Sequence, residues 1–278
     1  MSGSHAFATN HQDEVDSALK YMVNTFMQPG DGQSVKLDLK RYLEVANRNR
    51  EYPAFPLVKL PQVDMESLKA AQAPFCEILV QRESVREYSG TLSLLQLSQI
   101  LFLSAGIRKT DSNGTLYRHY PSAGGLFPID IFVCVQNVEG VEPGVYCYDP
   151  REHGLWHIGA RDASEVCLKA LTGALSFIGG ASCALLLSAD LDKTLWKYGG
   201  RGLRYVFLDC GHLAQNLSVS AQACGAGTCG IGGFCENEIH RVLGLAVPDE
   251  MVLYALALGV PKKSTMTKTV QNSAERYL

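Results

Sequence analysis

The sequence of 278 residues has no long apolar run, no cluster of basic residues and no signal-peptide core. A membrane-spanning helix needs about 20 consecutive apolar residues, and no segment approaches that length. The opening residues, MSGSHAFATNHQDEVD, are too polar for the apolar core of a secretion signal. A net charge of −3 without a basic cluster argues against a nucleic-acid binder. We therefore expect a cytoplasmic protein that binds neither membrane nor nucleic acid.

Metal-binding patterns are missing as well, although the chain has nine cysteines. An odd number of cysteines without a secretion signal is typical of reduced thiols. Cys224, Cys229 and Cys235 lie close in sequence, but they lack the CxxC spacing and the paired histidines of a zinc site. His153 and His157 lie on a predicted hairpin rather than a helix, so we interpret them as surface histidines. No metal is expected.

The composition fits one domain with an extension. Hydrophobic residues make up 46% of the chain and charged residues 19%, which is enough apolar material for a sizeable core. We place an N-terminal extension at residues 1–63 and the main domain at residues 64–278. Within the extension, residues 15–26 predict a short amphipathic helix, residues 29–33 a turn-rich linker, and residues 35–63 a proline-rich arm.

The hydrophobic periodicities of the main domain predict an α+β fold, with a central antiparallel or mixed sheet covered by helices. Helices are expected within residues 65–81, 94–105, 163–171, 203–224 and 236–243. Strands are expected at residues 129–136, 183–188, 228–231 and 251–259, with a β-hairpin over residues 144–158. Residues 108–120 are polar and contain glycine, so we expect a loop there.

The longest predicted helix carries two stripes of different character. Its apolar stripe comprises Leu203, Val206, Phe207, Cys210, Leu213, Ala214, Leu217, Ala221 and Cys224. A second line with the same spacing is polar and contains Tyr205, Asp209, His212 and Asn216. Taken singly, each of these polar residues is expected to satisfy a neighbour in the core. As a group they look more like the support of a functional site.

The pair Lys197 and Tyr198 comes just before this helix. Two polar residues ahead of a helix usually form a solvated lip. A phenol beside an ammonium is also a workable acid/base unit, because the positive charge favours phenolate and lowers the pKa of the tyrosine. The residues alone leave both interpretations open.

Two short motifs have the chemistry to bind a phosphate or a flat ring. Arg82, Ser84 and Arg86 alternate, which directs two guanidinium groups and a hydroxyl to the same side, as a phosphate grip requires. By spacing alone, surface charge is the simpler interpretation. Residues 121–125, PSAGG, form a turn of small residues where backbone can approach a ligand closely.

Three motifs together resemble one family. KYGGRGLRYVFLDCGHLAQN at residues 197–216, YPSAGGLFPIDIFV at 120–133 and RESVREY at 82–88 resemble the SagB/ThcOx-type dehydrogenases, which are FMN enzymes of the nitroreductase superfamily. The resemblance covers residues 75–262. It implies a nitroreductase-like fold, with a mostly antiparallel sheet covered by helices, and an obligate homodimer that holds FMN at its interface. In such a dimer the arm at residues 35–63 either wraps the partner or shapes a substrate mouth; a packed extension without substrate contact is the alternative.

The resemblance also implies the site residues. Lys197 and Tyr198 are the implied catalytic pair. The implied FMN contacts are Arg82, Ser84, Arg86, Ser122, Gly124, Gly125, Arg201, Gln215, Asn216, Ile231 and Gly232. Lys262, Lys263 and Lys268 are candidates for the FMN phosphate, although lysines near a terminus are usually solvated.

The sequence departs from the family pattern at three places. Glu83 stands where a basic residue or histidine is frequent, and Asp130 stands where Glu is common. GIGGF, at residues 230–234, keeps the Gly-Phe of a P-x-E-G-F run and loses its acid, as in the azoline-oxidising branch.

The implied activity is the oxidation of a thiazoline or oxazoline ring in a modified peptide to thiazole or oxazole. A base removes the Cα proton, a hydride passes from Cβ to the flavin N5, and dioxygen reoxidises the flavin. We predict that Tyr198 is the base and that Lys197 either lowers its pKa or stabilises the developing enolate-like charge. The partner that the resemblance implies is a cyclodehydratase or another biosynthetic protein.

Two other functions remain open. One is an NAD(P)H-dependent nitro- or ene-reductase on the same fold. The other is a non-catalytic docking subunit of a peptide-modifying complex.

Overall fold

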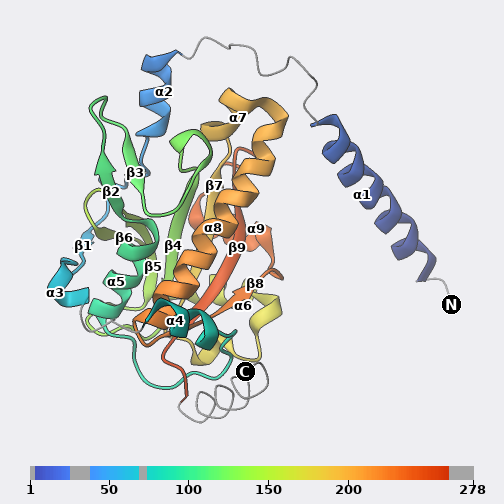
Figure 1. Ribbon diagram of the computed structural model, residues 1–278. Helices are drawn as coiled ribbons and strands as arrows, with labels where there is room; N and C mark the ends of the chain where they lie inside the picture. Colours follow the sequence, from blue (N-terminus) through green and yellow to red (C-terminus); the bar gives the residue numbers. More distant parts are fainter. Residues whose placement is uncertain (1–3, 26–37, 69–73, 263–278) are drawn as a thin grey trace, which may run out of the picture.

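The computed structural model describes residues 4–25, 38–68 and 74–262 (Figure 1). Its main sheet has the strand order β1-β6-β5-β4-β7-β9-β8, and every neighbouring pair is antiparallel. The strands are β1 (Leu57–Lys59), β4 (Ile129–Val135), β5 (Gly144–Asp149), β6 (Gly154–Gly159), β7 (Cys183–Asp190), β8 (Gly227–Ile231) and β9 (Glu250–Gly259). The predicted α+β class with a central antiparallel sheet is therefore confirmed.

Helices cover both faces of this sheet. The described helices are α1 (Ser4–Asn24), α2 (Leu39–Ala46), α3 (Met65–Leu68), α4 (Phe75–Gln81), α5 (Leu94–Ala105), α6 (Arg161–Ala170), α7 (Asp192–Tyr198), α8 (Gly202–Ala223) and α9 (Glu236–Leu243). Helices α5 and α8 contribute to the apolar cluster on one face, and α6 and α9 contribute to the cluster on the other. The predicted helical stretch at residues 65–81 appears as α3 and α4, with residues 69–73 outside the described residues.

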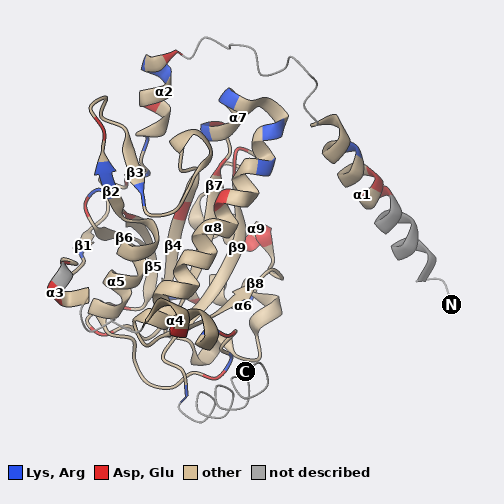
Figure 2. Ribbon diagram, in the orientation of Figure 1, with Lys and Arg blue, Asp and Glu red and all other residues tan. Residues whose placement is uncertain are grey.

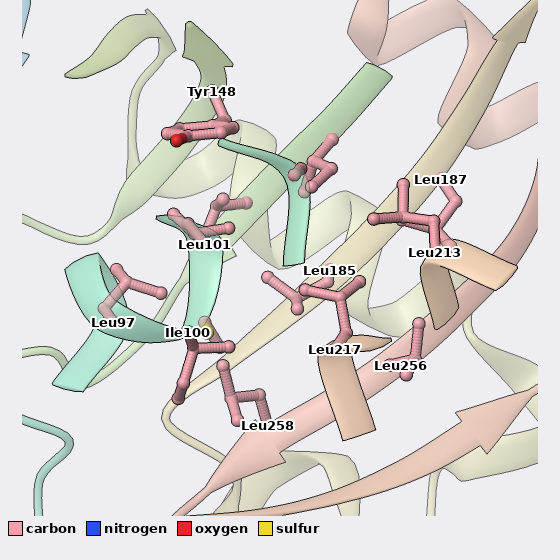
Figure 3. Packing of buried hydrophobic residues seen from close by; sticks show 14 of the residues in the cluster. Leu97, Ile100, Leu101, Tyr148, Leu185, Leu187, Leu213, Leu217, Leu256 and Leu258 are labelled. Atoms are coloured by element: carbon pink, nitrogen blue, oxygen red, sulfur yellow. The ribbon is translucent and has the colours of Figure 1, made fainter. Parts of the chain in front are cut away.

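The alternation of side chains along β7 explains why the sheet needs two helical layers. Leu185 and Leu187 face the cluster that contains Leu213 and Leu217 of α8 (Figure 3), whereas Leu186 faces the cluster on the other side. Successive strand residues point to opposite faces, so a central strand that is apolar at each position from Cys183 to Leu187 is buried on both faces. Helix α8 is therefore fixed along one side of the sheet.

The predicted loop at residues 108–120 is wrong, because these residues form a second, two-stranded sheet. Strands β2 (Ile107–Thr110) and β3 (Leu116–Arg118) pair antiparallel. The Asp111 carboxylate closes the turn by accepting hydrogen bonds from the backbone N–H groups of Asn113 and Thr115, both at 2.9 Å. Aspartate commonly stabilises turns in this way.

His153 is buried, so its assignment to the surface is also wrong. Its Nε2 lies 2.8 Å from Ser98 Oγ and its Nδ1 lies 3.1 Å from the Tyr148 hydroxyl. The hairpin that carries it is covered by α5 and by the end of the arm, since Nε2 also lies 3.2 Å from the Pro61 carbonyl oxygen. His157 is half-buried.

Two elements of the N-terminal extension, β1 and α2, are part of the main body. Strand β1 pairs with β6 and forms one edge of the sheet. Helix α2 packs against α7 and the loop after β3 through Val45, Ala46 and Leu126. The division of the chain at residue 63 stays a prediction, but the arm on its N-terminal side is built into the folded body.

The contacts found between helix α1 and the rest of the chain, among the side chains that the structure describes, lie near its C-terminal end, and the helix extends away from the main body (Figure 1). The Arg201 guanidinium donates to the Thr25 carbonyl oxygen at 2.6 Å, and Arg204 donates to Thr25 Oγ1 at 2.7 Å and to the Met22 carbonyl oxygen. Guanidinium groups suit the carbonyl end of a helix, where backbone acceptors lack partners.

Candidate functional site

Lys197 and Tyr198 occupy the last turn of α7, and their polar atoms converge on the turn at residues 123–125. Gly124 has φ of +64°, and a β-carbon built on it would lie 2.6 Å from the Tyr198 hydroxyl oxygen and 2.7 Å from Lys197 Nζ. Only glycine has room there without displacing both groups. The structure thus brings together Lys197, Tyr198 and Gly124, three residues that the sequence assigned to the site.

Burial acts on the pKa of both members of this pair. It raises the pKa of the Tyr198 phenol, and the neighbouring Tyr205, Tyr42 and Asp209 raise it further. Burial lowers the pKa of the Lys197 ammonium. The prediction that Lys197 lowers the pKa of Tyr198 is therefore wrong, because desolvation of the phenolate dominates. The phenol keeps its proton at neutral pH, and the lysine is the member whose neutral form becomes more accessible.

Asp209 of α8 holds the start of the glycine turn by hydrogen bonds. Its carboxylate accepts hydrogen bonds from Ser122 Oγ and, at 3.2 Å, from the backbone N–H of Ala123. Ser122 Oγ in turn accepts a hydrogen bond from the Phe127 N–H at 2.8 Å. The Ser122 hydroxyl, predicted to contact the cofactor, is thus engaged within its own chain. Burial raises the pKa of Asp209, and these hydrogen bonds partly offset the effect.

Of the polar residues predicted to form one line on α8, Tyr205 and Asp209 contact the site, whereas His212 is exposed. Tyr205 packs edge-on against the Tyr198 ring, with centroids 4.9 Å apart, and its hydroxyl accepts a hydrogen bond from Arg201 Nε at 2.9 Å. Asp209 is buried, whereas His212 is exposed. Arg201, predicted to bind the cofactor, instead connects Tyr205 to the end of α1. Lys and Arg gather where α7 meets α8 (Figure 2).

A second group of predicted residues lines a hollow between α8, β8 and β9. The hollow encloses about 650 Å³ including its open mouth. Its lining consists of Arg82, Ser84, Gly211, Ala214, Gln215, Ser218, Thr228, Gly230, Tyr254 and Leu256. The Arg82–Ser84 segment is placed by a bridge between Ser84 and Thr228 and by a 2.9 Å hydrogen bond from the Val85 N–H to the Thr228 carbonyl oxygen.

The chemistry of this hollow fits a phosphate-bearing, flat cofactor. A guanidinium, hydroxyls and an amide line it together with the small residues Gly211, Ala214 and Gly230. Charged and hydroxyl donors bind phosphate, and residues without large side chains let a ring approach the backbone. A β-carbon on Gly230 would meet the Tyr254 hydroxyl at 1.9 Å, so Tyr254 requires glycine at that position.

Several predicted contacts lie outside this hollow. Arg86 is exposed and donates to the Ser84 carbonyl oxygen at 3.3 Å. Asn216 is absent from the lining, although Gln215 is part of it. The Ile231 side chain is buried in a core cluster, and Gly232 is exposed. Lys262 Nζ lies 3.9 Å from a Glu87 carboxylate oxygen; Lys263 and Lys268 lie outside the described residues.

The two groups of site residues lie on opposite sides of α8. With 3.6 residues per turn, Gly211, Ala214, Gln215 and Ser218 share one side of the helix, and Asp209 points roughly the opposite way. Phe207 and Leu208 lie on the side of the hollow and are 52% and 57% exposed. Within one chain, therefore, the hollow and the turn held by Asp209, on which Lys197 and Tyr198 converge, lie on different sides of α8.

Sequence reasoning missed Tyr42 of α2 and Tyr254 of β9. The Tyr42 hydroxyl donates to the Gly124 carbonyl oxygen at 2.9 Å, and its ring lies beside Lys197. Tyr42 was visible only as one aromatic residue in a proline-rich arm. Tyr254 belongs to an apolar strand pattern, which gives no sign that its hydroxyl lies over Gly230.

We expect alanine at Gly124 to disrupt the pair. The substitution places a β-carbon against Lys197 Nζ and the Tyr198 hydroxyl and forces a residue with a side chain to adopt a positive φ. The free energy of unfolding should fall by about 1–3 kcal/mol, as measured by urea denaturation. Gly140→Ala is a matched control, because Gly140 has φ of +70° and nothing within 4 Å of the added carbon. Equal losses in both variants would mean that backbone strain alone is responsible.

Neither a metal centre nor a membrane helix is found in the part of the chain that the structure describes. No group of three or more His, Cys, Asp or Glu side chains there is arranged to hold a metal ion. Likewise, no helix in residues 4–25, 38–68 and 74–262 is long and apolar enough to span a bilayer.

Sequence relatives include a nitroreductase-type protein and two peptide-processing proteins. MJ1384 of Methanocaldococcus jannaschii, named as a nitroreductase, is 40% identical over 188 residues, covering 67% of this chain and 88% of that protein. The microcin B17-processing protein McbC of Escherichia coli is 27% identical over 136 residues, or 48% of this chain. The trifolitoxin-processing protein TfxB of Rhizobium leguminosarum is 28% identical over 190 residues, or 64% of this chain. The matches span 50% of McbC and 47% of TfxB.

Solved structures show the same fold. A nitroreductase-type protein from Ralstonia eutropha superposes with a TM-score of 0.62 at 25% identity, covering 77% of this chain and 94% of that one. A chain of the E. coli microcin synthetase McbBCD complex superposes with a TM-score of 0.58 at 21% identity, covering 87% and 86%. The family model described as "Nitroreductase family" matches residues 79–260. This chain therefore belongs to the nitroreductase family.

Proposed function

We propose that this protein is an FMN-dependent dehydrogenase of the oxidase type, which converts thiazoline or oxazoline rings of a modified peptide to thiazole or oxazole. The observation that carries the proposal is the half-buried amine and phenol of Lys197 and Tyr198, which converge above a glycine turn. The relatives McbC and TfxB, both named as peptide-processing proteins, support a peptide substrate. The similar McbBCD chain was solved within a synthetase complex, which supports a partner protein such as a cyclodehydratase. That complex holds a truncated pro-peptide, which supports a peptide substrate.

Arg82, Ser84 and Gln215 would hold the cofactor in the hollow beside α8. The guanidinium and the hydroxyl are suited to its phosphate, and the amide to polar edges of its ring system. When bound, FMN supplies an acceptor for the hydride that leaves Cβ of the substrate ring, and dioxygen reoxidises it. The protein's own contribution is to position the substrate and to move the Cα proton.

Lys197 is the better candidate for the proton acceptor. Its lowered pKa makes a neutral amine more accessible, and a neutral amine can accept the Cα proton. Tyr198 keeps its proton and would donate a hydrogen bond to the substrate atom on which negative charge develops. Loss of a proton from Cα and a hydride from Cβ leaves a C=C bond and an aromatic ring. This assignment reverses the roles that the sequence suggested.

A homodimer would bring the two halves of the site together. The hollow and the Lys197 pair lie on opposite sides of α8, so one ligand can contact both only if two chains contribute to it. The exposed Phe207 and Leu208 beside the hollow offer apolar area for such an interface. We propose that each site combines the hollow of one chain with the Lys197–Tyr198 pair of its partner.

A specific observation favours a second candidate function, an NAD(P)H-dependent reductase. MJ1384, which is named as a nitroreductase, is 40% identical to this chain. An anaerobic visible spectrum separates the candidates. Bleaching of the flavin by a thiazoline-containing peptide, with recovery in air, is expected; bleaching by NADPH and not by the peptide would establish a reductase. A colourless protein that takes up no FMN would indicate a docking subunit and contradict the proposal.

Arg82→Gln should weaken FMN binding. The substitution removes a charged donor from the hollow, and a hydrogen bond to a charged group contributes about 1.5–3 kcal/mol, so Kd should rise by about ten-fold or more. Fluorescence titration of the apoprotein measures it. Arg241→Gln on the exposed side of α9 is the control. An unchanged Kd for Arg82→Gln would remove this arginine from the cofactor site.

A further inference from the structure

Lys197 Nζ lies over two aromatic rings. It is 5.2 Å from the ring centroid of Tyr198 and 5.1 Å from that of Tyr42, which belongs to α2 of the N-terminal arm. Rings at this distance contact the end of the side chain in either protonation state and limit the positions that the amine can occupy. Among residues 4–25, 38–68 and 74–262, no hydrogen bond from Lys197 is found, so the two rings are the contacts that fix the amine.

The hydroxyl of Tyr42 contacts the turn at Gly124 and Gly125, on which the amine of Lys197 converges. It donates to the Gly124 carbonyl oxygen at 2.9 Å, and a β-carbon built on Gly125 would lie 3.3 Å from it. One side chain thus contacts both Lys197 and the turn beneath it. Burial raises the pKa of Tyr42, so the phenol retains the proton that it donates to Gly124.

Tyr42 is held firmly enough to serve this purpose. Helix α2 starts at the cap residue Asp38, whose carboxylate accepts from the Arg41 N–H at 3.1 Å. The Arg41 guanidinium lies 5.0 Å from the centroid of the Trp196 ring on α7. Val45 and Ala46 are buried against the same helix. The helix that carries Tyr42 is therefore attached to the helix that carries Lys197.

We propose that Tyr42 is a positioning residue for Lys197, whose ring and hydroxyl fix the amine over the Gly124 turn so that the N-terminal arm completes the site. This inference rests on the proposed function, in which Lys197 accepts the substrate proton. A lysine side chain has four rotatable carbon–carbon bonds, and a free amine would occupy many positions. Contact with two rings reduces the number of these positions, which favours reaction in the correct geometry.

We call the rings of Tyr42 and Tyr198 around Lys197 Nζ the cage, and its presence can be tested without an activity assay. In protein labelled with ¹³C at lysine Cε, the Hε signal of Lys197 should lie upfield of the solvated lysines, because the protons lie over ring faces; Lys197→Met assigns the signal. Tyr42→Leu should move it back toward the solvated lysines, and Tyr42→Phe should leave it in place. Phe55→Leu, which removes a ring of the same arm that packs on Tyr52, is the matched control. The remaining lysine signals report whether each variant is folded.

Turnover of a synthetic thiazoline-containing tripeptide then tests the positioning role. Removing the hydroxyl in Tyr42→Phe should lower kcat by about three-fold. Removing the ring in Tyr42→Leu should lower kcat by about ten-fold, with KM within about two-fold. A loss of overall structure would instead reduce the active fraction in both variants and disturb the other lysine signals.

Three results would overturn the inference. The first is an Hε signal that stays in place in Tyr42→Leu, which would show that the cage does not exist. The second is a signal that moves while kcat is unchanged, which would show that the cage does not position the amine. The third is full turnover by Lys197→Met, which would refute the role of Lys197 in the proposed function as well; the signal in Tyr42→Leu would still show whether the cage forms.

Discussion

Replacement of Lys197 by methionine is expected to lower the rate of thiazoline oxidation by about 10²- to 10⁴-fold, the usual contribution of a general acid or base. Methionine keeps most of the apolar stem of the lysine and removes the amine, which lies over the rings of Tyr42 and Tyr198. FMN should remain bound, because Arg82, Ser84 and Gln215 of the hollow are unchanged. Stopped-flow measurement of flavin bleaching under anaerobic conditions reports the step directly.

The pH dependence and a second variant distinguish the two members of the pair. If Lys197 is the base, the bleaching rate should rise with pH up to a pKa below the ordinary value for lysine, since only the neutral amine accepts a proton. Tyr198→Phe should retain that dependence and lose a hydrogen-bond donor. Lys169→Met, on an exposed side chain of α6, should leave the rate unchanged. A pH-independent rate, or wild-type bleaching by Lys197→Met, would contradict the assignment.

Replacement of Arg50 by methionine is expected to cost about 3–5 kcal/mol of unfolding free energy, because it leaves a buried carboxylate without its partner. Arg50 Nε donates to an Asp130 carboxylate oxygen at 2.8 Å, and Arg50 Nη2 also donates to Glu250. The Asp130 side chain is only 8% exposed. Urea denaturation of the full chain, followed by tryptophan fluorescence, measures the loss.

Two further variants separate this ion pair from a general effect of losing arginine. Arg50→Met combined with Asp130→Asn should recover part of the stability, since no unpaired charge remains at Asp130. Arg241→Met, whose partner Glu238 is 56% exposed, should change the free energy by less than about 1 kcal/mol. Similar losses at Arg50 and Arg241 would contradict the expectation. A large loss at Arg50 alone would show that the N-terminal extension and the sheet unfold together.

Local patterns in the sequence predicted most of the fold. The apolar residues of β7 and β9 and the periodicity of α8 identify these elements because each pattern is set by burial over many consecutive residues. The hairpin at residues 107–118 escaped prediction, because its strands are three and four residues long and largely polar. Its turn depends on a single carboxylate, Asp111.

The site was harder to predict than the fold. The motif residues Lys197, Tyr198 and Gly124 are brought together as the family resemblance implies. Arg201 is engaged with α1, and the pKa of Tyr198 moves opposite to the prediction. Both outcomes depend on burial and on partners distant in sequence, namely Thr25 and Tyr42. Motif letters carry no information about such contacts.

The placement of two functional groups on opposite sides of α8 has a genetic consequence. In the proposed dimer, a chain lacking Arg82, at FMN concentrations below its raised Kd, and a chain lacking Lys197 each have low activity alone. When they are mixed, the heterodimer contains one site with both defects and one with neither, so half of its sites regain activity. Sites confined to single chains would never complement each other in this way. Because these groups lie on two sides of one helix, each active site of the proposed dimer needs residues from both chains.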